Sequence, residues 1–107
     1  PPADIVAVSI STDAPFDRSK FYAAMDELKE NILRLKGNIH FGDNVRFVEA
    51  VGPTVSENDS CRELLSRKED ATAFTVIAWR IDKERLRERF LNCRSQNHDP
   101  AQSAPLS

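Results

Sequence analysis

The feature that most constrains the fold is a set of five apolar residues that recur at a helical spacing. The spacings are 4, 3, 4 and 3 residues, and the residues are Phe21, Met25, Leu28, Ile32 and Leu35. Side chains three or four residues apart share one face of an α-helix. The pattern predicts an amphipathic helix over residues 17–35. Asp17 is its expected N-cap, Phe16 and Phe21 form a hydrophobic staple, and Gly37 ends it in a left-handed conformation.

Several other stretches have the composition of β-strands. Two of them are rich in β-branched residues and apolar on both faces, which is typical of strands covered on at least one side. Two more alternate apolar and polar residues on either side of a Gly-Asp-Asn turn, and they predict a β-hairpin. The strands are expected at residues 5–10, 38–41, 45–51 and 72–79.

A second helix is expected after Asp82, with Leu86, Phe90 and Cys93 on its apolar face. The predicted order is β-α-β-β-β-α. It favours an α+β fold, a two-layer sandwich in which two helices cover one face of an approximately four-stranded sheet. The domain should span residues 1–94, with residues 56–70 as a mobile insertion and residues 95–107 as a disordered tail.

Charge and apolar content exclude two classes of function. The chain has 107 residues, and its net charge is −2 with a pI near 5.7, so it lacks the basic excess of a general nucleic-acid binder. Its apolar runs fall short of the roughly 20 residues that a membrane helix needs. Two cysteines do not make a disulfide framework, which favours a cytoplasmic setting. The chain begins with two prolines and no Met, so we expect it to be a piece of a longer protein.

The sequence contains few residues that could perform chemistry. Its three glycines form neither of the glycine-rich motifs that bind nucleotide phosphates. His40, Cys61 and His98 are weak candidates for a metal site, because zinc usually takes three or four protein ligands. Arg34 and Lys36 beside Gly37 could bind an anion or a partner; in the alternative interpretation they only complement the negative end of the preceding helix.

The segment Leu33-Arg34-Leu35-Lys36-Gly37, followed by Asn-Ile-His-Phe, resembles the C-terminal domain of the CobW family of P-loop GTPases. The resemblance extends over residues 5–93. It includes the Pro-Phe-Asp opening of the first helix, a stretch that leads to a Val-Gly pair, and a last strand that leads into a short helix, at residues 15–17, 47–52 and 74–82. Only Arg34, Lys36 and Gly37 correspond to the family motif, and no catalytic role follows for them.

The resemblance implies a non-catalytic accessory domain of a GTP-dependent metallochaperone that takes part in zinc or cobalt homeostasis, such as cobalamin biosynthesis. GTP, Mg²⁺ and the metal would belong to the parent protein and not to this chain. The expected partners are the GTPase domain of the same parent chain, a client metalloprotein or another protomer. Two alternatives remain open, namely an unrelated interaction module with a ferredoxin-like fold and a weak metal carrier.

Overall fold

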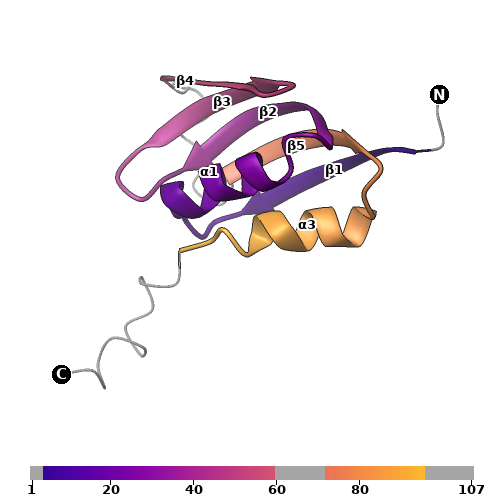
Figure 1. Ribbon diagram of the computed structural model, residues 1–107. Helices are drawn as coiled ribbons and strands as arrows, with labels where there is room; N and C mark the ends of the chain where they lie inside the picture. The colour runs from indigo at the N-terminus through magenta and orange to yellow at the C-terminus, as the bar shows by residue number, and fades with distance from the viewer. Residues whose placement is uncertain (1–3, 60–71, 96–107) are drawn as a thin grey trace.

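Seven elements make up the part of the chain that the computed structural model describes, which is residues 4–59 and 72–95 (Figure 1). They form one five-stranded sheet and two helices. In chain order they are β1 (Ile5–Thr12), α1 (Arg18–Glu27), β2 (Ile32–His40), β3 (Val45–Val51), β4 (Thr54–Asp59), β5 (Thr72–Trp79) and α3 (Lys83–Leu91). The α+β class is therefore confirmed.

The sheet has the strand order β1-β5-β2-β3-β4, and every neighbouring pair is antiparallel. The predicted hairpin is present as β2 and β3. The expectation of about four strands was wrong, because residues 54–59 pair with β3 as a fifth strand after a turn at Gly52 and Pro53. Residues 56–59 thus belong to the sheet and not to an insertion, while the rest of the expected insertion and the tail after Ser95 lie outside the described residues.

Both helices cover the same face of the sheet (Figure 1). The strand side chains beneath them alternate with side chains that point to the other face, as the period of two in a β-strand requires. The buried residues form one continuous core between the two layers. Its fully buried members include Phe16, Phe21, Phe90, Ile10, Leu35, Ile39, Leu86, Val8, Val48, Val76 and Cys93.

Aromatic rings occupy the centre of this core. Phe74 on β5 meets Phe16 and Phe90 in edge-to-face contacts, with ring centroids 5.8 and 5.4 Å apart. Phe21 of α1 joins the cluster and lies 6.4 Å from Phe16, as the predicted staple requires. Both predicted N-caps are confirmed. The Asp17 carboxylate accepts the amide hydrogen of Lys20, and the Asp82 carboxylate accepts that of Arg85.

The predicted first helix is too long, because α1 ends at Glu27 and Ile32 begins a strand. The helical spacing of Ile32 and Leu35 has another cause. Ile32 lies opposite Ala78 and Arg34 lies opposite Ile77, so Leu33 is the extra residue of a β-bulge. The bulge places Ile32 and Leu35 on the same buried face although they are three residues apart, which imitates a helical pattern.

Gly37 lies in the middle of β2, and the prediction that it ends a helix was wrong. Its φ angle is +153°, and a Cβ atom built on it would lie 2.4 Å from the Phe74 Cα atom and the Ala73 carbonyl oxygen. Real Cβ atoms do not approach backbone this closely. A glycine is therefore required here by the close approach of β2 to β5 and not by a turn.

We expect Gly37→Ala to lower the free energy of unfolding by at least about 2 kcal/mol, since the new methyl group must push two central strands apart. Chemical denaturation monitored by circular dichroism measures this change. Gly52→Asn is the matched control, because Gly52 has φ +59° with open space around its Cβ position, and asparagine tolerates that conformation. An equal loss of stability in both variants would contradict the packing argument.

Candidate functional site

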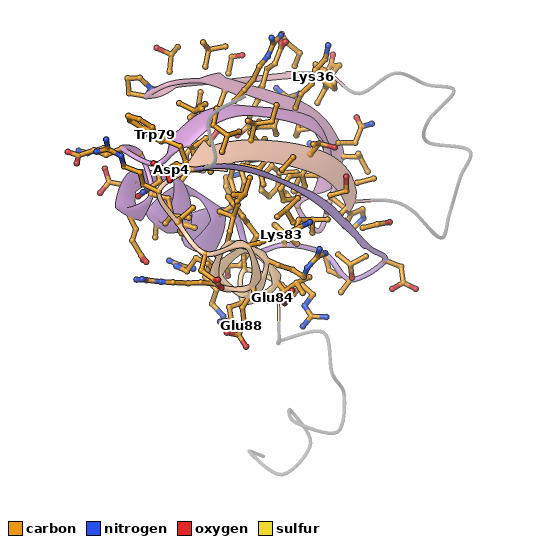
Figure 2. All side chains as sticks on the ribbon, turned by 90° about the vertical axis from the view of Figure 1, so that its right-hand side faces the viewer. Asp4, Lys36, Trp79, Lys83, Glu84 and Glu88 are labelled. Atoms are coloured by element: carbon orange, nitrogen blue, oxygen red, sulfur yellow. The ribbon has the colours of Figure 1, made fainter. Side chains whose placement is uncertain are left out.

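The face of the sheet opposite the helices is exposed, and it carries the basic residues of the family motif. In Figure 2 the side chain of Lys36 lies on this outer side, away from the α3 residues Lys83, Glu84 and Glu88. Arg34 and Lys36 are both exposed, because they alternate with the buried Leu35 along β2. The sequence placed these cations at a helix end and a turn. The structure places them on the open face of a sheet instead.

Arg34 and Lys36 are flanked by residues of β5 on one side and of β3 on the other. Lys36 lies across from Thr75 on β5 and Glu49 on β3. Arg34 lies across from Ile77 and Val51. The basic residues therefore occupy the middle strand of this face, with a polar row beside Lys36 and an apolar row beside Arg34. Gly37 of the same motif has a structural role and does not join them as a binding residue.

One end of the open face is apolar, and we call it the apolar end. It consists of the exposed side chains of Ile5, Leu33 and Val51 together with the half-buried Ile77 and Trp79. Val51 is 61% exposed, Leu33 38% and Ile5 37%. The one other large apolar side chain of comparable exposure in the described chain is Tyr22, on α1. Exposed apolar residues are thus concentrated in one place, which is typical of an interaction surface.

Arg80 and Trp79 form a stacked pair at this end. The guanidinium carbon of Arg80 lies 4.4 Å from the centre of the Trp79 ring, within the range of a cation–π contact. Arg80 has a φ of +59°, and it is the one non-glycine residue with a positive φ in the described segments. The Trp79 indole N–H donates to the Glu30 carbonyl oxygen at 3.1 Å, so the ring is held in place. The sequence analysis did not identify this pair, although a tryptophan at the end of a strand was a visible signal.

The candidate metal ligands do not come together in the described structure. His40 lies at the end of β2, where its Nδ1 accepts the amide hydrogen of Gly42 at 3.3 Å. Cys61 and His98 lie outside the described residues. Within residues 4–59 and 72–95 there is no group of three His, Cys, Asp or Glu side chains that could hold a metal ion. The described residues do not fit the metal that the family resemblance implies for the parent protein.

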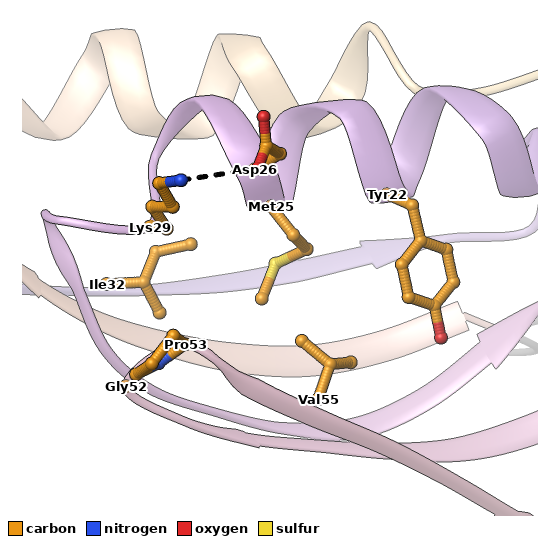
Figure 3. A pocket seen from close by; sticks show the side chains of 8 residues that line it. All are labelled: Tyr22, Met25, Asp26, Lys29, Ile32, Gly52, Pro53 and Val55. Atoms are coloured by element: carbon orange, nitrogen blue, oxygen red, sulfur yellow. Dashed lines mark ion pairs between the residues drawn. The ribbon is translucent and has the colours of Figure 1, made fainter.

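A shallow cavity of about 170 Å³ lies between α1 and the turn that joins β3 to β4 (Figure 3). Apolar side chains make up most of its walls, including Met25, Ile32 and Val55. Its two charged lining residues, Asp26 and Lys29, form an ion pair with each other at 3.6 Å. Because these two charged groups are exposed to solvent and paired with each other, we assign no catalytic role to the cavity.

A polar cluster connects α1 to the outer strands, and no pattern in the sequence indicated it. The Glu57 carboxylate on β4 pairs with Arg18 and accepts the Tyr22 hydroxyl hydrogen at 2.5 Å. Arg46 on β3 donates to Glu57 at 3.2 Å and to Asp59 at 2.6 Å. The partners are 11 to 39 residues apart in sequence, so only the tertiary structure brings them together.

These contacts shift the pKa values of the cluster in opposite directions. Burial, and then the hydrogen bond to Glu57, raises the pKa of Tyr22 to about 12. Burial also acts to raise the pKa of Glu57, but hydrogen bonds from Arg18, Tyr22 and Arg46 outweigh it, so the net pKa lies below its usual range. The cluster is therefore most stable with Glu57 ionised and Tyr22 neutral.

The sign of the pH dependence follows from these directions. Ionised Glu57 stabilises the fold above about pH 4.5, and this contribution is lost as the pH falls through its lowered pKa. Neutral Tyr22 stabilises the fold below about pH 10. This contribution is lost as the pH rises from about 10 to about 12, through the raised pKa of Tyr22.

Because Tyr22 is the single tyrosine of the chain, its ionisation can be followed by ultraviolet absorbance. We expect a midpoint near 12 in the folded protein. In Glu57→Gln the midpoint should fall but stay above about 10, since burial of the ring remains. Glu49→Gln, which removes a carboxylate from the opposite face, should leave the midpoint unchanged. A midpoint in Glu57→Gln equal to that of the native chain would contradict the assigned contact.

Among the described residues, no helix is long and apolar enough to cross a membrane. Two solved structures share this fold, the Zn(II)-bound YjiA GTPase from E. coli and a Zn(II)-bound triple mutant of the YjiA GTPase. Each is 20% identical in sequence to this chain and superposes on it with a TM-score of 0.67. The match covers 86% of this chain and 30% of the GTPase chain. The chain thus spans about a third of the length of these GTPases. No curated protein matches it.

The comparison with protein families is more specific than the comparison of folds. The family model described as the cobalamin synthesis protein cobW C-terminal domain matches residues 5–94. This range includes every strand and helix of the structure. It also confirms the resemblance that the sequence motifs indicate. The chain therefore belongs to the family of CobW C-terminal domains.

Proposed function

We propose that this chain is a non-catalytic binding domain that works beside the GTPase domain of a CobW-type metallochaperone in the cytoplasm. In this proposal it contacts the GTPase domain of the same parent protein, and the assembly handles zinc or cobalt for a client protein. The open face of the sheet is the contact surface. Arg34 and Lys36 are its basic residues, and Gly37 keeps their strand in the central position.

The observation that carries the proposal is the concentration of exposed apolar side chains on one face of the sheet. A domain that worked alone would gain stability by covering Val51, Leu33 and Ile5, because burying apolar surface is favourable by about 25 cal/mol per Å². A domain that binds a partner keeps such residues exposed until the partner covers them. The match to a family of C-terminal domains also supports a chain that binds a partner while another domain of the parent protein carries the GTPase activity.

Nucleotide and metal chemistry are assigned to the parent protein and not to this chain. The three glycines do not form a phosphate-binding loop, and in the described structure His40 belongs to no group of three potential metal ligands. The chain's own residues would then position the partner and shield apolar surface. No step of nucleotide hydrolysis or metal transfer is derived from them.

The proposal predicts direct association in solution. When the GTPase domain of the parent protein is titrated into this chain, calorimetry should give a one-to-one complex with a dissociation constant of about 10 μM or tighter. Nucleotide turnover by the isolated GTPase domain shows that it is folded. If a folded GTPase domain gives no heat and does not co-elute with the chain in gel filtration, the proposed contact is wrong.

The proposal also predicts that the isolated chain lacks a tight metal site of its own. Titration with zinc or cobalt, with a matched run in excess chelator, should show no stoichiometric binding tighter than about 1 μM. Cys61→Ser and His40→Ala should leave the titration unchanged. A tight one-to-one site that either substitution removes would favour a metal carrier instead.

A further inference from the structure

We propose that the apolar end of the open face, with Arg34, Lys36 and Arg80 around it, docks onto an acidic surface of the GTPase domain that has apolar side chains at its centre. This inference rests on the proposed function and names the docking residues and the chemistry of the partner. It is carried by the net positive charge of the open face and by the exposed apolar side chains at one end of it.

The charge of this face is opposite in sign to that of the whole chain. The net charge of the chain is −2, yet the charged strand residues that alternate onto the open face are Arg34, Lys36 and Glu49. Arg80 adds a third cation where it stacks on Trp79. α3, on the other side of the domain, carries both signs, with the carboxylates Glu84 and Glu88 among the cations Lys83, Arg85, Arg87 and Arg89. Opposite charges steer association, so a face with three cations and one carboxylate favours an acidic partner.

The apolar end has the composition of an interface centre. Tryptophan and arginine are enriched among the residues that contribute most to binding, and they act best when surrounded by side chains that exclude water. Here Trp79, with Arg80 stacked on it, lies across from Ile5, and the exposed Leu33 and Val51 lie on the next two strands at the same end of the face. The β-bulge at Leu33 allows β2 to keep Ile32 in the core while it presents Leu33 and Arg34 to the exterior.

The arrangement at Arg80 is also costly to the free domain. A positive φ at a residue other than glycine is strained, and it persists where surrounding contacts hold it. The side-chain amide of Asn31 donates to the carbonyl oxygens of Trp79 and Arg80 at 3.1 and 3.3 Å, and the Arg80 amide donates to Asp4. These contacts fix the guanidinium group over the indole before any partner arrives, which lowers the entropy lost on binding.

The experiment measures binding of the parent's folded GTPase domain to three variants of this chain by calorimetry. Arg34→Glu reverses a charge of the proposed surface, and Val51→Asp places a carboxylate at its most exposed apolar position. Lys83→Glu is the matched control, since it makes the same charge reversal on α3, away from the open face (Figure 2). Circular dichroism and the melting temperature establish that each variant is folded.

We expect Arg34→Glu and Val51→Asp to weaken binding at least about tenfold, and Lys83→Glu to change it less than about twofold. Raising NaCl from about 50 to about 300 mM should weaken binding of the native chain. Trp79 is the single tryptophan, so its indole N–H gives one signal in a ¹⁵N-labelled chain. That signal should shift when unlabelled GTPase domain is added.

The possible results separate this inference from the proposed function. Binding that is the same for all three variants overturns the docking surface, and with it the open face as the contact surface, but leaves the proposed association with the GTPase domain standing. A folded GTPase domain that does not bind at all overturns both. If the native chain instead forms a dimer that Val51→Asp disrupts, the face is an interface between copies of the chain, and the inference is wrong.

Discussion

The fold depends on the contact between Gly37 and Phe74, where β2 approaches β5 so closely that no side chain fits between them. Because the two central strands meet here, Phe74 reaches the rings of Phe16 and Phe90, which lie before α1 and in α3. Both helices are thereby held on the same face of the sheet. Because the helices cover one face of the sheet, the other face stays exposed. The packing of Gly37 against Phe74 therefore helps to determine which surface is available to a partner.

Side chains along β2 alternate between the core and the open face of the sheet, so the two faces of this strand have different roles. Leu35 and Ile39 enter the core, whereas Arg34 and Lys36 point outward. A motif in which Gly37 directly follows Lys36 thus combines a packing requirement with exposed positive charge. The polar cluster around Glu57 acts on the helix-covered side, where it fastens α1 to β3 and β4 through Tyr22 and Arg46. Stability is therefore provided on one side of the sheet, while the proposed binding is assigned to the other.

Much of the fold could be predicted where local chemistry decides it. The caps Asp17 and Asp82, the β2–β3 hairpin and the central strand at residues 72–79 were all confirmed, because side-chain capping, turn residues and β-branched composition act over a few residues. The length of the first helix was not predictable in this way. The bulge at Leu33 gave Ile32 and Leu35 a helical spacing within a strand. The fifth strand was also missed, because its polar sequence shows its role only when it pairs with β3.

By itself the sequence determined the class of fold, the family and the identity of the basic motif, because these depend on composition and on short runs of residues. Only the tertiary structure decided what the motif does. It placed Arg34 and Lys36 on an open sheet face, made Gly37 a packing residue, and gathered Ile5, Leu33, Val51 and Trp79 at one end of that face. These residues come from four strands, β1, β2, β3 and β5. Which of them become neighbours is decided by strand order and register, which are set by contacts between segments far apart in the sequence.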